Sequence, residues 1–132
     1  MSNLPRLEIK RVFENILINE IGVRYIDDAF QTGVEKEVQV MIPEMTEEYE
    51  RIRLQSKLNC TLSITFNFFS KVNETGVHEA VYKLINIGPT HKDLVKFKIS
   101  GMYPSSSFTS YNAESSDGSV EAQVILTLQY IM

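Results

Sequence analysis

The sequence predicts an α+β, mainly β protein in which antiparallel sheets form a barrel or sandwich and one amphipathic helix covers them. Two long stretches, 58–68 and 120–132, alternate apolar and polar residues almost without error. A strand turns successive side chains to opposite faces, so each stretch has one apolar face and one polar face. A third segment, about 75–87, instead repeats apolar residues at helical spacing.

The composition fits one domain spanning residues 1–132. The chain is 43% hydrophobic and 23% charged, which is ordinary for a globular protein and argues against disorder. A chain of this size needs neither a disulfide nor a metal to fold. Its net charge of −4 argues against tight binding to phosphate, because such binding usually depends on a basic patch.

The sequence predicts a protein made in a reducing cytoplasm, without membrane contact. Its single cysteine, Cys60, is on the apolar face of a predicted strand and is expected to be a small buried residue. No apolar run approaches the roughly 20 residues of a membrane helix. The N-terminus lacks the apolar region of a signal peptide.

The first 42 residues are expected to supply two strands. Leu7 and Ile9 alternate with charged residues, whereas the apolar residues of 12–21 follow helical spacing; we favour an opening strand that runs into a loop. Alternation returns at 35–42, and Pro43 is expected to end that strand because proline cannot donate to the ladder.

The acidic segment 44–50 is expected to be an exposed connection. Alternation resumes at Arg51 and continues in phase into the 58–68 stretch. Residues 35–42 and about 51–69 are therefore expected to form a long hairpin arm.

The helix at about 75–87 has clear start and stop signals. Asn73 or Thr75 can cap its first turn, and Gly88 followed by Pro89 ends it. Its apolar positions are one face that would cover a sheet: Val77, Ala80, Val81, Leu84 and Ile85.

Two further strands are expected after the helix. Residues 95–99 alternate, the segment 101–104 breaks that pattern, and the serine-rich stretch 105–116 is expected to be a loop. Asp117-Gly118 is a strong turn signal in front of the last strand.

The sequence offers no positive sign of catalysis, so we expect no enzyme and no catalytic, metal or cofactor site. His78 and His91 lack the spacing of a zinc site, and no phosphate-binding glycine motif is present. The carboxylates of Asp27-Asp28 would point apart on an extended chain. The hydroxyls of 105–107 have no neighbouring base in the sequence.

The order of elements in the last third resembles the tail tube proteins of contractile-tailed bacteriophages. A predicted strand ends at Gly101 and leads into Met102-Tyr103-Pro104, and the chain closes on an alternating strand with Tyr130 near its end. A long alternating strand, one amphipathic helix and a further strand precede this block, in the order of that family. The resemblance covers about 58–132, extends by pattern to 35–57, and does not reach the first 34 residues.

The resemblance implies a structural virion protein that forms stacked hexameric rings. Each subunit would lend its long hairpin strands to one inner barrel, which closes the exposed strand edges. The lumen would pass DNA without specific binding during genome ejection. The implied partners are further copies and other tail proteins such as sheath and baseplate, in a virion tail assembled in the host bacterial cytoplasm.

Two sets of residues are candidates for the lumen or the ring interface. The first is the polar face of the long strand, which would otherwise be an ordinary solvated surface: Asn59, Thr61, Ser63, Thr65 and Asn67. The second is the acidic segment with Glu44, Glu47 and Glu48, expected to be a loop that meets the next ring.

Several alternatives stay open on the sequence. On the same fold, the chain would be a baseplate or tube-initiator protein, a tail terminator, or an Hcp-like secretion tube. A small-ligand-binding β-barrel would need a closed cavity in the monomer. A small α+β enzyme would need a cleft with convergent titratable groups.

Overall fold

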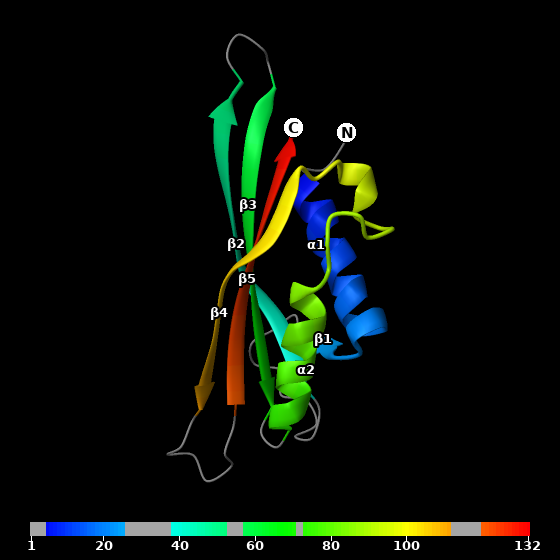
Figure 1. Cartoon of the computed structure of the whole chain (residues 1–132), viewed down its shortest axis with the longest axis vertical. Helices are drawn as coiled ribbons and strands as arrows, with labels where there is room; N and C mark the ends of the chain where they lie inside the picture. The colour runs from blue at the N-terminus through cyan, green and yellow to red at the C-terminus, as the bar shows by residue number, and fades with distance from the viewer. Residues whose placement is uncertain (1–4, 26–37, 53–56, 71–72, 112–119) are drawn as a thin grey trace.

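A computed structural model describes residues 5–25, 38–52, 57–70, 73–111 and 120–132. Five strands in these ranges form one sheet in the order β1-β2-β3-β5-β4, and the helices lie on one side of it (Figure 1). The elements follow in chain order: α1 (Pro5–Ile16), η1 (Leu17–Ile21), β1 (Arg24–Tyr25), β2 (Gln39–Arg51), β3 (Leu58–Ser70), α2 (Glu74–Ile85), η2 (Val95–Phe97), β4 (Gly101–Tyr111) and β5 (Val120–Ile131).

The sheet confirms the predicted α+β, mainly β class. β2 pairs antiparallel with β3, β3 with β5, and β5 with β4, whereas the short β1 lies parallel to β2. The 13 residues of β3 extend over about 43 Å at roughly 3.3 Å per residue. Within the described ranges the sheet stays open, so its strands enclose no barrel cavity of the kind that a ligand-binding barrel needs.

The core lies between the helices and one face of the sheet. The even-numbered side chains of β3 are buried there, as the alternation predicts. Phe13 of α1 packs edge-on against Phe66 of β3, with ring centroids 5.5 Å apart. Full burial of each such side chain contributes about 1.5–3 kcal/mol, so these contacts hold the helices on the sheet.

The prediction for the first residues was wrong, because residues 5–16 form helix α1 rather than a strand. The alternation of Leu7 and Ile9 covers too few residues to outweigh the helical spacing that follows. Ile9, Phe13 and Ile16 recur on one helical face, and all three are buried. Gly22 then ends the helical region with a φ of 81°, a left-handed conformation that glycine adopts at little cost.

The prediction that a strand ends at Pro43 was also wrong. β2 continues to Arg51, so the acidic segment 44–50 is a strand and not a loop. Its register against β3 shifts between Met41 and Glu44, on either side of the proline. Such an irregularity lets the strand accommodate a residue that has no N–H to donate.

A third correction concerns the segment that follows α2. Residues 95–97 form the short helix η2, and Lys98 adopts a φ of 54°, so no strand exists at 95–99. β4 begins instead at Gly101, where a break was expected, and runs through the serine-rich stretch to Tyr111. Its register shifts next to Pro104, as in β2.

The strongest sequence signals were correct. β3, α2 and β5 lie where the alternation and the helical spacing place them. The Asn73 side chain caps α2 by accepting a hydrogen bond of 2.8 Å from the Gly76 N–H. Cys60 is buried, as expected. Asp27-Asp28 and Asp117-Gly118 lie outside the described residues.

None of the helices in the described ranges is long and apolar enough to cross a membrane.

Candidate assembly surface

One face of the sheet has no helix over it, and we call it the open face. The odd-numbered side chains of β3 point to it, because the even-numbered ones are buried against the helices. All five residues of the predicted polar row lie there: Asn59, Thr61, Ser63, Thr65 and Asn67. The structure therefore places this row along β3, on the side of the sheet away from the helices that Figure 1 shows.

Carboxylates of β2 lie beside this row. Glu44, Glu48 and Glu50 each pair directly with a member of the row, so they share its face. Glu121 of β5 joins them, because it pairs with the odd-numbered Phe69. Every charged side chain that β2 to β5 place on the open face in the described ranges is thus a glutamate, whereas Arg24 of the short β1 pairs with Gln39 and lies at the edge of the same face.

The rest of the open face is mainly uncharged. Ser63 and Thr127 lie across from each other on β3 and β5, with their hydroxyl oxygens 3.3 Å apart. Gln123 and Gln129 add amides on β5, and Phe108 of β4 adds an aromatic side chain that is 53% exposed. These polar groups interact well with water, although apolar side chains such as Ile125 and Ile131 also lie on this face, and β2 to β5 offer no cation to a phosphate there.

Glu47 does not join the other two glutamates of the predicted set. It pairs with Leu62, so it points to the helix-covered face, and its side chain is only 1% exposed. The hydroxyls of Tyr49, at 2.6 Å, and Tyr130 donate hydrogen bonds to its carboxylate. Arg6 of α1 lies 3.4 Å away, so the buried charge is both paired and hydrogen-bonded.

This carboxylate changes the titration of its neighbours. Burial, together with the hydrogen bond to Glu47, raises the pKa of Tyr130 far above its usual range. The hydrogen bond to Glu47 is also the main reason why the pKa of Tyr49 is raised. Burial raises the pKa of the Cys60 thiol. All three pKa values move further from neutral pH. The cluster therefore suits a structural role better than acid–base catalysis.

The two edges of the sheet are open. β1 pairs with only Gln39 and Val40 of β2, and no other described strand pairs with β2 on that side. β4 pairs with β5 and with no other described strand. Unpaired N–H and C=O groups on long edge strands are a template for pairing with another chain.

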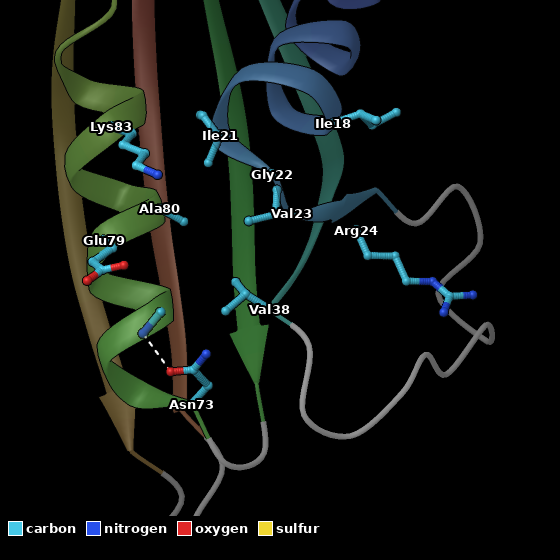
Figure 2. Close-up of a pocket in the computed structure, with 11 residues that line it drawn as sticks. Ile18, Ile21, Gly22, Val23, Arg24, Val38, Asn73, Glu79, Ala80 and Lys83 are labelled. Carbon is cyan, nitrogen blue, oxygen red and sulfur yellow. Dashed lines mark hydrogen bonds between the residues drawn. The ribbon is translucent and has the colours of Figure 1, made fainter.

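The pocket shown in Figure 2 lies among η1, α2 and the start of β2 and has a volume of about 530 Å³. Apolar residues such as Val23 and Val38 line it together with Glu79 and Lys83. No Ser, Cys or His is among the described residues that line it, so they supply no hydroxyl, thiol or imidazole for a nucleophile–base pair.

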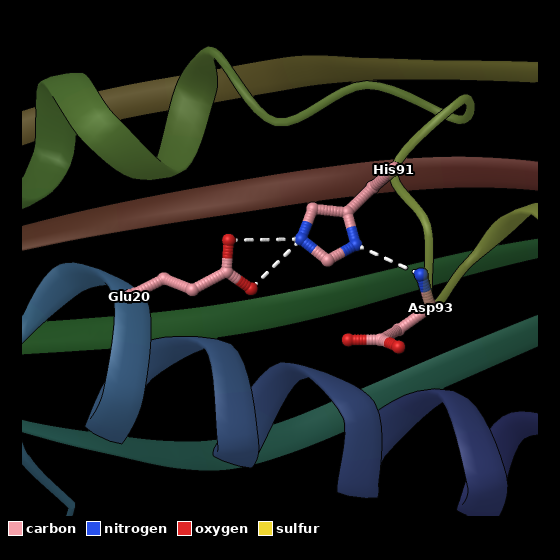
Figure 3. Close-up of side chains that lie close together, drawn as sticks. All are labelled: Glu20, His91 and Asp93. Atoms are coloured by element: carbon pink, nitrogen blue, oxygen red, sulfur yellow. Dashed lines mark hydrogen bonds and ion pairs between the residues drawn. The ribbon is translucent and has the colours of Figure 1, made fainter.

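Glu20, His91 and Asp93 form a small cluster that sequence patterns did not reveal (Figure 3). His91 Nδ1 accepts a hydrogen bond of 3.1 Å from the Asp93 backbone N–H, which places the ring proton on Nε2. Nε2 then donates to the two Glu20 oxygens, at 2.8 and 3.0 Å. A metal on Nε2 would need the proton on Nδ1 instead, so we interpret the cluster as a hydrogen-bonded bridge from η1 to the loop before η2.

Sequence reasoning found the polar row and expected exposed strand edges, but it missed the Glu47 cluster and did not identify which strands form the edges. The row follows from alternation alone. Glu47 was assigned to a loop because Pro43 precedes it, although Met45, Glu47 and Tyr49 alternate with Thr46 and Glu48 as in a strand. The open edges depend on strand order, which local sequence does not encode.

Comparisons with known proteins show a shared fold. No protein-family model matches the chain, and no curated protein matches it. Among solved structures, a chain from the virion of a native gene transfer agent (GTA) particle is similar, with a TM-score of 0.65 and 7% sequence identity. The alignment covers 95% of this chain and 92% of that chain.

Proposed function

We propose that this protein is a structural virion protein, the subunit of a bacteriophage tail tube built from stacked hexameric rings. The observation that carries the proposal is the sheet itself. In the described ranges it has one face covered by helices, one open face whose charges on β2 to β5 are all glutamates, and two largely unpaired edges. Its likeness to a chain from a gene transfer agent virion adds support.

The open edges supply the ring contact in this proposal. β4 of one copy would pair with β2 of the next, which continues the sheet from subunit to subunit. Repetition around a closed ring satisfies the backbone groups of both edges and leaves no edge exposed. The brief pairing of β1 leaves most of β2 available for this contact.

The open face would line the channel. Four long strands in one copy cannot enclose a channel, whereas six copies would supply about 24 strands. Barrels of 16–18 strands already leave an aqueous channel. Glutamates and uncharged polar side chains on the inner wall would repel DNA weakly and hold none of its phosphates, which suits passage of a genome.

The first test is direct observation of the purified protein by negative-stain electron microscopy, with light scattering over a range of concentrations. The proposal expects six-fold rings, or stacks of them, with an open centre. A species that stays monomeric at every concentration would contradict a role as the main tube subunit.

A pair of variants tests the edge contact. Ser106 and Ser110 lie on β4 at open-face positions, and the facing edge of β2 carries glutamates. Ser106→Glu with Ser110→Glu would place like charges across the contact and is expected to abolish rings while the monomer stays folded by circular dichroism. The matched variant Ser106→Lys with Ser110→Lys should keep rings; equal assembly of both variants would refute β2–β4 pairing.

A further inference from the structure

A pocket with an apolar floor and a basic rim lies at the end of the sheet where β5 finishes. Its volume is about 510 Å³. The apolar part includes Phe97, Ile131 and Met132, and the rim consists of Lys57, Lys96 and Lys98. We call it the lysine pocket.

The lysine pocket keeps its positive charge. All three lysines are exposed, and no Asp or Glu lines the pocket. None of the three forms an ion pair with another residue in the described part of the chain. The Lys96 ammonium lies 5.2 Å from the Phe97 ring centroid, a contact that leaves its charge uncompensated. The pocket therefore suits an acidic partner.

The apolar surface around the pocket indicates that this partner is a protein. Ile131 is 56% exposed and Met132 is 37% exposed, and both line the pocket. A small anion would compensate the lysines but would leave these side chains in water. A protein surface would cover them as well, which is the usual meaning of exposed apolar side chains that gather in one place.

The opposite end of the molecule carries the complementary charge. α2 starts at Glu74, and Glu121 is the second residue of β5. Figure 1 shows that both elements begin at the end of the long axis opposite to the end of β5 and to η2. Both glutamates are exposed, and Glu74 also lies 3.9 Å from His78 one turn further along α2, so the described residues place lysines at one end of the sheet's long axis and two carboxylates at the other.

We propose that the lysine pocket of one copy binds the acidic end of a second copy, the end that carries Glu74 and Glu121. This contact is head to tail. It does not close on itself and therefore continues from copy to copy along an axis. The proposal rests on the proposed function, because it names the contact that joins one ring to the next.

Charge reversal at either end tests this contact in the full-length protein. Lys96→Glu with Lys98→Glu should give separate rings and at least tenfold fewer stacks, counted by negative-stain microscopy and sedimentation. Glu74→Lys with Glu121→Lys should do the same. All four substitutions together should restore stacking, because the two charges are exchanged. Stacking of the unaltered protein should also weaken at about 1 M salt, where charges are screened beyond about 3 Å.

A control variant separates the pocket from net charge. Lys10→Glu with Lys83→Glu changes the net charge equally at positions outside the lysine pocket, and it should stack as the unaltered protein does.

The outcomes distinguish this inference from the proposed function. Absence of rings in the unaltered protein would contradict the proposed function itself. Rings that never stack, or rings of the Lys96 and Lys98 variant that stack undiminished, would overturn the contact at the lysine pocket. Failure of the four-residue variant to recover stacks would overturn its pairing with Glu74 and Glu121.

Discussion

At the scale of single residues, Glu47 shows how one buried carboxylate joins three elements. It belongs to β2, accepts a hydrogen bond from Tyr130 of β5, and lies beside Arg6 of α1. Removal of one partner would leave part of a buried charge without compensation, which costs more than the net gain of the bond that is lost. The cluster therefore specifies how α1 lies on the sheet.

Tyr130 is expected to make the protein less stable at alkaline pH. Its pKa is raised in the folded state, so between pH 10 and that raised value the unfolded chain releases a proton that the folded chain keeps. The contribution of Tyr130 to the free energy of unfolding is therefore fully present below about pH 10. Above that pH it falls by up to about 1.4 kcal/mol per pH unit.

The variant Tyr130→Phe should lack the contribution that the Tyr130 hydroxyl makes to the free energy of unfolding. We expect it to be less stable at pH 7 by about 1.5–3 kcal/mol, because a hydrogen bond to a charged group is lost. Above pH 10 its stability should fall less steeply than that of the unaltered protein. Urea unfolding from pH 7 to 11 measures both effects, and parallel curves for the two proteins would contradict the assignment.

At the scale of elements, a helix or strand was predicted correctly from the sequence when its pattern extended over many residues. The 13-residue β3 and the amphipathic α2 repeat their patterns over enough residues to decide the outcome. In α1, two alternating residues pointed to a strand, and burial of Phe13 against Phe66 supported the helix. In β2 and β4, a proline was interpreted as a stop although a shift in register accommodates it.

The candidate surface was predictable only in part, for the same reason. Alternation gives the faces of a strand, so the polar row was placed correctly. The split of Glu47 from Glu44 and Glu48 required the knowledge that 44–50 is a strand. The edges and the lysine pocket bring together residues distant in sequence, such as Lys57 and Lys98, and no local pattern contains that information.

The cap of α2 gives a prediction at this scale. Asn73→Ala removes the acceptor for the Gly76 N–H and should cost about 1 kcal/mol of stability. For a chain of this size the melting temperature should fall by about 4 °C. Asn73→Ser keeps an acceptor at the same position and should melt close to the unaltered protein. Thermal melts followed by circular dichroism compare the three, and a full loss in the serine variant would argue against capping.

At the scale of the whole molecule, the distribution of charge between the two sides of the sheet supports the channel. The charged side chains that β2 to β5 place on the open face are all glutamates in the described positions, with Arg24 of β1 at its edge, whereas the helix side mixes both signs, as in the Lys10–Glu14 pair. Because like charges repel, a channel wall with negative charge would let DNA pass without binding it.

Reversal of this charge should turn the channel into a DNA-binding surface. Glu44→Lys, Glu48→Lys and Glu50→Lys together should make assembled rings retain duplex DNA. Affinity should fall about 40-fold between 50 and 200 mM salt if the ring makes three new lysine–phosphate contacts, and more steeply if it makes further ones. Filter binding measures this, with Glu8→Lys, Glu14→Lys and Glu79→Lys on the helix side as the control of equal net charge. Equal retention by both variants would argue against a channel lined by the open face.

The order of the strands also affects how the protein is made. β5 lies between β3 and β4 in the sheet, yet the chain encodes it after both. While the ribosome is still synthesising the chain, β3 lacks one neighbour and β4 has nothing to pair with. The two edges that we assign to neighbouring subunits therefore belong to one sheet only after β5 has been translated and has inserted. In the proposed assembly, a chain whose β5 is not yet translated would lack the complete sheet and would not join a ring.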